Sequence, residues 1–182
     1  MAAAPSQGSV WAPSNEGLQQ LLALFHSAPQ ASNAQHRAIQ QQLVEFNAIP
    51  DYNNYLAYIL NHLRHEQGAV RQLAGLTLKN NCSQHWLHVQ PAVQEYVRDA
   101  LLCCLSDPAK YIRQVVSSCI TAIVQKGGLE TWPTLVPALY RMLDSNDPNV
   151  LDGAFASLSK ICEDSPEKLA RDVRNRPLDR SF

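Results

Sequence analysis

Four stretches of the chain carry apolar residues at the i, i+3, i+4, i+7 spacing of an amphipathic helix. They begin at Gln35, Ala69, Tyr111 and Val150. When they are aligned on their third residues, the apolar positions of the four stretches are Ile39, Leu43 and Val44; Val70, Leu73, Ala74 and Leu78; Ile112, Val115, Val116, Cys119 and Ile120; and Leu151, Ala154, Phe155 and Leu158. We therefore predict four amphipathic helices whose apolar faces are buried, with Leu73, Val116 and Phe155 nearly fully buried.

Another helical pattern precedes each of these stretches. Ser14, Asp51 and Thr131 can each cap such a preceding helix, and Pro91 can occupy the first position of one. Two Asp-Pro pairs, Asp107-Pro108 and Asp147-Pro148, stand forty residues apart, and each predicts the start of the following helix. No segment alternates between apolar and polar residues with a period of two, so no sheet is predicted.

The third residues of the four stretches are Arg37, Arg71, Arg113 and Asp152, which lie 34, 42 and 39 residues apart. Helix pairs that recur at about 40 residues are typical of HEAT repeats, which stack because one pair cannot cover its own apolar face. We predict an all-α fold, an α-solenoid of about four HEAT-type helix pairs from a right-handed superhelix. An irregular helical bundle remains the alternative. The predicted divisions are a flexible segment (1–13), four units (14–49, 50–89, 90–128 and 129–166) and a charged, disordered tail (167–182).

Composition narrows the class of protein. Apolar residues make up 46% and charged residues 17% of the 182 residues, which is typical of a folded, soluble protein. The net charge of −1 indicates neither a nucleic-acid-binding protein nor one attracted to anionic membranes. No apolar run approaches the length of a membrane span, and the N-terminus lacks the pattern of a secretory signal. Cys103, Cys104 and Cys119 stand in apolar runs, which favours an intracellular location.

The stretch Cys82-x-x-His85-x-x-His88 offers three possible zinc ligands. A fourth ligand is not evident, and we expect this stretch to be a loop between repeats. The chain also lacks a glycine-rich phosphate loop and the G-x-S-x-G and H-E-x-x-H motifs. We therefore predict a protein that is not an enzyme and has no catalytic, metal or cofactor site. A thiol- or metal-dependent enzyme built on Cys82 to His88 remains a minor alternative.

The stretch "AGLTLKNN" from Ala74 poses a specific question, because glycine within a helix costs about 1 kcal/mol relative to alanine. Leu76 and Leu78 are predicted to be buried, and a helical wheel places Gln72, Gly75 and Lys79 on the opposite side. The equivalent positions of the other helices are also short or polar, and we expect them to form one exposed ridge: Ala38, Gln41 and Glu45; Gln114, Ser117 and Thr121; Gly153, Ala156 and Lys160. Small residues on such a ridge would let the backbone of a partner protein approach.

Five segments together resemble the N-terminal end of the importin-β (karyopherin-β) nuclear transport receptors, and of its transportin branch in particular. They occur in the family's order: "GLQQLL" from Gly17, "PDYNNYL" from Pro50, "AGLTLKNN" from Ala74, "WPTLVPAL" from Trp132 and "GAFASLSKICEDS" from Gly153.

This resemblance implies a nuclear import receptor that shuttles between cytoplasm and nucleus and binds the GTP form of the small GTPase Ran on its inner helices. It also implies nucleoporins with FG repeats as partners, and cargo proteins only in a full-length form. The implied Ran-binding residues are Gln41, Arg71, Gln72, Gly75, Lys79, Asn80, Gln114, Ser117, Thr121 and Lys160. A general HEAT-repeat scaffold without GTPase specificity remains the alternative.

The C-terminal sequence departs from the family pattern. After "NRPL" from Asn175 the pattern would continue into another apolar helix, whereas this sequence reads "DRSF". We therefore expect the cargo-binding repeats to be absent and an apolar patch to be exposed on the distal face of the fourth unit. Such a patch predicts a marginally stable chain that self-associates.

Overall fold

The computed structural model describes residues 11–167. These residues form eight α-helices and three short 3₁₀-helices, and none of them lies in a strand. The α-helices follow one another as α1 (Asn15–Ser27), α2 (Asn33–Phe46), α3 (Tyr52–His62), α4 (Gly68–His85), α5 (Pro91–Cys104), α6 (Lys110–Gly127), α7 (Leu135–Leu143) and α8 (Pro148–Asp164). The 3₁₀-helices are Ala28–Gln30, Trp86–His88 and Leu129–Thr131. The prediction of an all-α protein is therefore confirmed.

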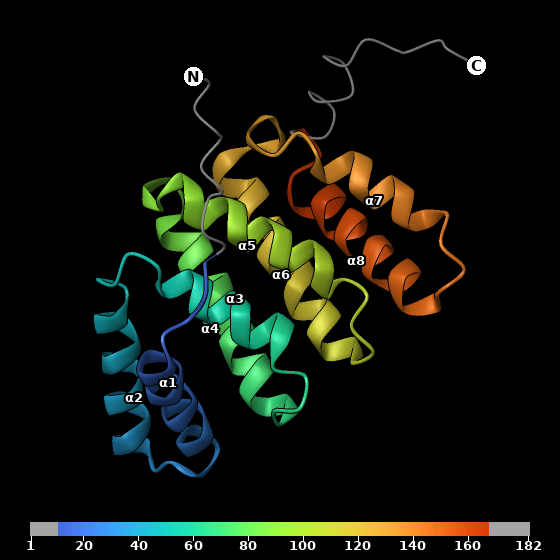
Figure 1. Cartoon of the computed structure of the whole chain (residues 1–182). Helices are drawn as coiled ribbons and strands as arrows, with labels where there is room; N and C mark the ends of the chain where they lie inside the picture. Colours follow the sequence, from blue (N-terminus) through green and yellow to red (C-terminus); the bar gives the residue numbers. More distant parts are fainter. Residues whose placement is uncertain (1–10, 168–182) are drawn as a thin grey trace, which may run out of the picture.

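The helices are arranged as consecutive pairs that stack side by side (Figure 1). The second helices α4, α6 and α8 form one row, in which α6 packs against both neighbours, and the first helices α3 and α5 pack against each other. Within the pairs, α3 packs on α4, α5 on α6 and α7 on α8. This is the arrangement of a HEAT-type solenoid, as the repeat spacing predicted.

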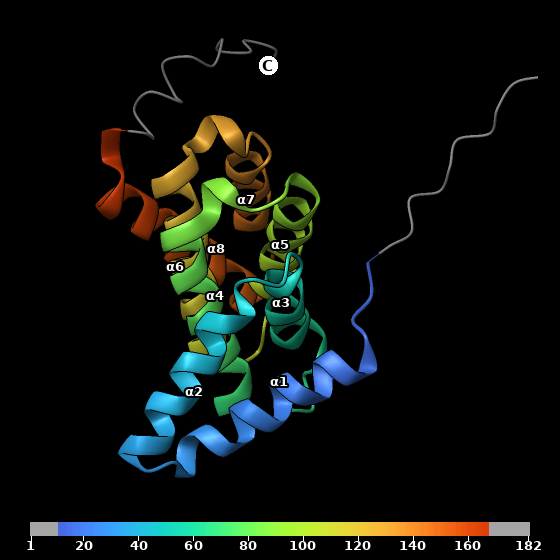
Figure 2. The ribbon, with the colours of Figure 1, turned by 90° about the vertical axis from the view of Figure 1, so that its left-hand side faces the viewer.

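The first pair differs from the others. Helices α1 and α2 meet near residue 30 and diverge from there (Figure 2), and α1 rather than α2 makes the larger contact with α4. The apolar pattern of α2 is also the weakest of the four, with only Ile39 and Leu43 buried. Val44, which we expected on the apolar face, is 60% exposed.

Most helix starts follow the predicted capping residues. Ser14 accepts a hydrogen bond from the Gly17 amide, Pro91 opens α5, and Asp147 caps α8 by accepting from the Asn149 amide. Thr131 does not cap a helix, because it belongs to a 3₁₀ turn and α7 begins only at Leu135. Asp107 is also two residues too early, since α6 begins at Lys110.

The core runs continuously through the four pairs, and Val116 is fully buried as predicted. Leu73 is only partly buried, and Phe155 is 60% exposed, so the prediction that both are nearly fully buried is wrong. On α8 the buried side consists instead of Gly153, Ala154, Ser157 and Ile161. Phe155 therefore lies on the accessible side of α8.

Trp11 lies in the segment that we expected to be flexible, yet it is held against the first helices. Its indole Nε1 donates a hydrogen bond to Asp51 Oδ2 at 2.9 Å, and its ring meets the edges of Tyr55 and Tyr96 at centroid distances of 5.1 and 5.0 Å. Of the predicted tail (167–182), residues 168–182 lie outside the described residues. Within the described part, no helix has the length and apolar character needed to cross a membrane.

Candidate protein-interaction surface

One side of the row of second helices remains accessible. On α4 its residues are Gln72, Leu76, Lys79 and Asn80, and on α6 they are Gln114 and Ser118. We call these six residues the second-helix surface. Gln72 and Gln114 directly follow Arg71 and Arg113, and Leu76 and Ser118 stand five residues after the same two arginines. The two helices therefore present equivalent repeat positions to solvent. Asn80 and Gln114 are exposed, whereas Gln72 and Lys79 are half-buried.

The surface ends in a groove of about 300 Å³ between α4 and α2. Leu76 and Val44 line the groove, and both are exposed, at 43% and 60%. The other lining residues are five amides, two leucines and a threonine: Gln40, Leu43, Asn47, Leu73, Thr77, Asn80, Asn81 and Gln84. Apolar side chains surrounded by uncharged hydrogen-bonding groups suit a protein partner better than a small charged ligand.

Four of the ten predicted Ran-binding residues are not on this surface, because they are buried. Ser117 and Thr121 are 0% and 3% exposed. The Ser117 hydroxyl donates to the Arg113 carbonyl at 2.9 Å and accepts from the Ser157 hydroxyl of α8 at 3.0 Å. Since α6 is flanked by α4, α5 and α8, only a narrow strip of it meets solvent. The helical wheel assumed one buried side, and this assumption placed both residues in solvent.

Gly75 is buried for a related reason. A Cβ atom at this position would lie 2.3 Å from Cγ1 of Val115 and 3.3 Å from Cδ1 of Leu60. Its carbonyl oxygen also accepts a hydrogen bond from the Cys119 thiol at 3.4 Å. The glycine therefore allows α6 to approach α4 closely, and the prediction that it lies on an exposed ridge is wrong.

Arg71 is 5% exposed and serves the interior. Its Nε and Nη2 donate to the Leu60 carbonyl oxygen at 3.2 and 2.7 Å, and Nη2 also donates to the Asp107 carboxylate. The Asp107 carboxylate in turn accepts a hydrogen bond from the Ala109 amide at 2.9 Å, just before α6 begins. Arg71 thus joins the second unit to the third.

The remaining predicted residues are accessible to different degrees. Gln41 on α2 is exposed and its amide donates to Glu45, and Lys160 on α8 is half-buried. Leu76 was expected to be buried, and its exposure was missed because leucine in a helical pattern is ordinarily assigned to the core. Its place among polar neighbours, Gln72 and Asn80, was the available signal.

The possible zinc ligands do not come together. Cys82 is buried inside α4, which continues to His85, while His88 lies in the following 3₁₀ turn. The expectation of a loop at Cys82 is therefore wrong. Burial raises the pKa of the Cys82 thiol, which disfavours the thiolate that a metal requires. Among residues 11–167 no group of three or more potential ligands is placed to hold a metal ion.

Comparison with known proteins agrees with this fold. Residues 39–107, which extend from within α2 to the loop between α5 and α6, match the importin-beta N-terminal domain. The chain is 42% identical to transportin-1 of Homo sapiens and of Mus musculus over 168 residues, or 92% of its length. It is 38% identical to transportin of Dictyostelium discoideum over 172 residues, or 93% of its length.

The chain belongs to the importin-β family, and its sequence is similar to the N-terminal region of transportins. It spans about a fifth of the length of these relatives, since the matched part covers 19% of transportin-1 and 18% of the Dictyostelium protein.

Proposed function

We propose that this chain is the Ran-binding N-terminal portion of a transportin-like nuclear import receptor, which acts in protein transport through protein–protein contacts. The observation that carries this proposal is the match of residues 39–107 to the importin-beta N-terminal domain. That region contains all of α4, and α4 supplies four of the six residues of the second-helix surface. The part of the chain with the family signature therefore also carries most of the second-helix surface.

The chemistry of this surface suits a folded protein partner. Leu76 offers an apolar contact, Gln72, Asn80 and Gln114 offer amides that both donate and accept hydrogen bonds, and Lys79 offers a cation at the side. We propose that Ran in its GTP form lies across these residues, with Gln41 and Lys160 at the two ends. Arg71, Gly75, Ser117 and Thr121 would support the surface from beneath instead of contacting the GTPase.

The wider partners and location follow from the same proposal. Nucleoporins with FG repeats, cargo recognition in a full-length form, and shuttling between cytoplasm and nucleus are proposed from the family relationship alone. Catalysis is not proposed, because the relatives are named as transport proteins.

The test is the affinity of the purified chain for Ran loaded with a non-hydrolysable GTP analogue and for Ran loaded with GDP. We expect binding of the GTP form that is at least about 100-fold tighter, which corresponds to about 3 kcal/mol. The general HEAT-repeat scaffold predicts no such preference. Equal affinity for the two forms, or no binding of either, would therefore favour that alternative.

A further inference from the structure

A pocket of about 410 Å³ lies between the connection from α2 to α3 and the end of α4. Its lining residues come from 47–53 on one side and from 81–90 on the other. We call it the asparagine pocket, because Asn47, Asn53 and Asn81 all line it. None of the six residues of the second-helix surface does so. A ligand held in this pocket therefore need not touch that surface, and its binding does not depend on the proposed Ran contact.

Two buried amide side chains meet at the asparagine pocket. Asn53 of α3 is 9% exposed and Asn81 of α4 is 6% exposed. The Asn81 side-chain nitrogen Nδ2 donates a hydrogen bond to Asn53 Oδ1 at 2.9 Å. The other polar atom of each amide, Asn53 Nδ2 and Asn81 Oδ1, has no hydrogen-bond partner among residues 11–167. Polar groups of residues this far buried are nearly always paired, so the two free atoms indicate positions for polar atoms of a ligand.

Both free amide atoms can be reached from the pocket. Within the described residues, the buried side-chain atoms that are sealed from solvent and lack a partner are Tyr52 Oη, Asn54 Oδ1 and Arg98 Nε. Neither free amide atom is among them, and both asparagines line the pocket. Because a hydrogen bond joins the two amides, the pocket presents an N–H donor and a carbonyl acceptor close together.

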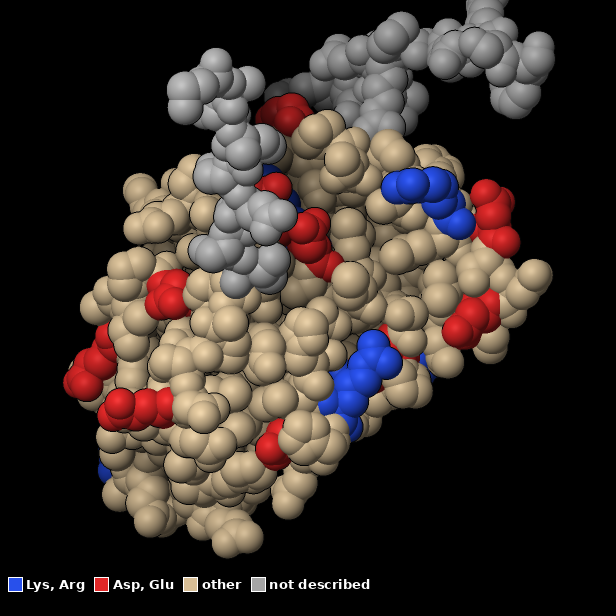
Figure 3. Space-filling view, viewed as in Figure 1, with Lys and Arg blue, Asp and Glu red and all other residues tan. Residues whose placement is uncertain are grey.

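The charge of the lining narrows the class of ligand. Lysine, arginine, aspartate and glutamate are absent from the described residues that line the pocket. By contrast, acidic and basic side chains are scattered over the face of the molecule seen in Figure 3. A nucleic acid would need cations for its phosphates, and a basic peptide would need carboxylates. The pocket therefore suits an uncharged ligand that carries both an N–H group and a carbonyl group.

We propose that the asparagine pocket binds an extended, uncharged segment of a partner protein through the backbone of that segment. In an extended chain the N–H and C=O groups of one residue point to the same side. One residue can therefore donate to Asn81 Oδ1 and accept from Asn53 Nδ2. A helix cannot do this, because its backbone groups are bonded internally. Ile49, which is 43% exposed, and Val89 offer apolar contacts to the neighbouring side chains.

The segment has room to continue beyond the two asparagines. Asn47 and Asn81 line both the asparagine pocket and the groove beside Leu76, so the two hollows adjoin. From Leu76 to His85, α4 rises about 14 Å at about 1.5 Å per residue, which corresponds to about four residues of extended chain. The described residues that line the groove also include no lysine, arginine, aspartate or glutamate. An uncharged segment of about four residues therefore fits both hollows.

The test titrates acetyl-Thr-Val-Thr-dimethylamide into the isotopically labelled chain and follows the backbone and side-chain amide NMR spectra. One comparison peptide is N-methylated at every residue, which removes its N–H donors and keeps its carbonyl groups. Uridine, the other comparison, presents an N–H group between two carbonyl groups on a nucleobase. We expect saturable shifts for the unmodified peptide within 47–53 and 81–90, including the Asn53 side-chain amide. The N-methylated peptide and uridine should bind at least about five-fold more weakly.

Two variants test the assigned contacts. Asn53→Asp keeps the acceptor for Asn81 Nδ2 but replaces the free donor with an acceptor, so it should weaken the peptide at least about ten-fold. Asn47→Trp, at an exposed position of the lining, should narrow the pocket and weaken binding without altering the buried pair. Asn33→Asp and Asn33→Trp, at an exposed position of α2 outside the pocket, are the matched controls and should change nothing.

Four results would each overturn the proposal: no saturable shift with the unmodified peptide, equal binding of its N-methylated form, tighter binding of uridine, or an unchanged affinity in a folded Asn53→Asp variant. Should Asn53→Asp unfold the chain, Asn47→Trp alone decides. Unchanged affinity in that variant would then overturn the proposal, and weakened binding with unaffected Asn33 controls would support it.

Discussion

Arg113 of α6 holds Asp152 of α8 through two nitrogen atoms of its guanidinium group. Nε and Nη2 donate to the same carboxylate oxygen at 2.9 and 2.7 Å, while Nη1 donates to the Asp107 carbonyl oxygen at 2.7 Å. One unit earlier, Arg71 makes the corresponding link from α4 to the Asp107 side chain. Two arginines at equivalent positions of the repeat thereby connect the second, third and fourth units.

Replacing Arg113 should therefore weaken the whole stack. In Arg113→Ala the Asp107 carbonyl and the Asp152 carboxylate lose their donors, and the free energy of unfolding should fall by about 2–4 kcal/mol. Most of this loss belongs to the buried carbonyl, because the Asp152 side chain is 40% exposed. Urea denaturation followed by far-UV circular dichroism measures the change.

Arg37 provides the control, since it occupies the equivalent position of the first unit but is exposed. Arg37→Ala should alter the free energy of unfolding by no more than about 0.5 kcal/mol. Equal losses in the two variants would show that the links between units contribute nothing specific.

Gly75 should not tolerate even a methyl group. Gly75→Ala adds helix propensity worth about 1 kcal/mol, but the new Cβ would overlap with Val115, and overpacking of this kind costs about 1–3 kcal/mol. We expect net destabilisation in thermal or urea unfolding. Combining it with Val115→Ala should give a loss smaller than the sum of the two single losses, because the smaller side chain makes room. A stabilised Gly75→Ala variant would contradict the packing role of this glycine.

The five cysteines should separate into two classes. Cys103 and Cys162 are exposed, whereas Cys82, Cys104 and Cys119 are buried. Burial raises the pKa of Cys104 to about 12 and that of Cys119 well above its ordinary value. In the native chain, a thiol reagent such as 5,5′-dithiobis(2-nitrobenzoic acid) should therefore label Cys103 and Cys162 promptly and the other three only upon unfolding. Rapid labelling of a third thiol would contradict this assignment.

The same thiols predict the direction of a pH effect on stability. Their folded-state pKa values exceed that of an unfolded thiol, about 8.5, so the unfolded chain releases these protons first as the pH rises. The free energy of unfolding should therefore be unaffected by them at neutral pH and decline above about pH 9. Replacing the three buried cysteines with alanine should reduce this alkaline slope, as measured by urea denaturation at a series of pH values.

The repeated apolar spacing was sufficient to predict the helical pairs, and the caps at Ser14 and Asp147 were correct because a cap depends on residues within one turn. The burial of Ser117 and Thr121 and the exposure of Phe155 could not be predicted in this way. It depends on which neighbours flank each helix, and the wheel of a single helix does not contain that information.

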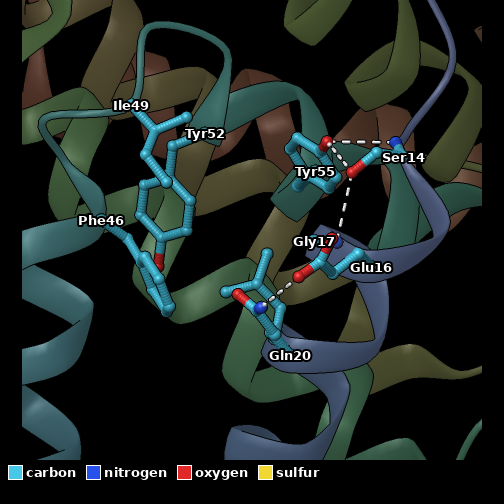
Figure 4. Close-up of a pocket in the computed structure, with 9 residues that line it drawn as sticks. Ser14, Glu16, Gly17, Gln20, Phe46, Ile49, Tyr52 and Tyr55 are labelled. Atoms are coloured by element: carbon cyan, nitrogen blue, oxygen red, sulfur yellow. Dashed lines mark hydrogen bonds between the residues drawn. The ribbon is translucent and has the colours of Figure 1, made fainter.

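A pocket lined by Glu16, Phe46 and Tyr52 (Figure 4) also could not be predicted from local pattern. Its lining residues come from the start of α1, the end of α2 and the start of α3, and they meet only where the first two helix pairs join.

The account rests most directly on the second-helix surface as the contact for Ran. The decisive measurement is the affinity of Ran in its GTP form for the Lys79→Glu variant, compared with the unaltered chain and with Lys126→Glu, an exposed lysine near the end of α6. Lys79→Glu reverses a charge on the surface, so we expect binding at least ten-fold weaker, about 1.4 kcal/mol or more, with the fold intact. Lys126→Glu should bind as the unaltered chain does. An unchanged affinity in Lys79→Glu, or equal losses in both variants, would contradict the assignment.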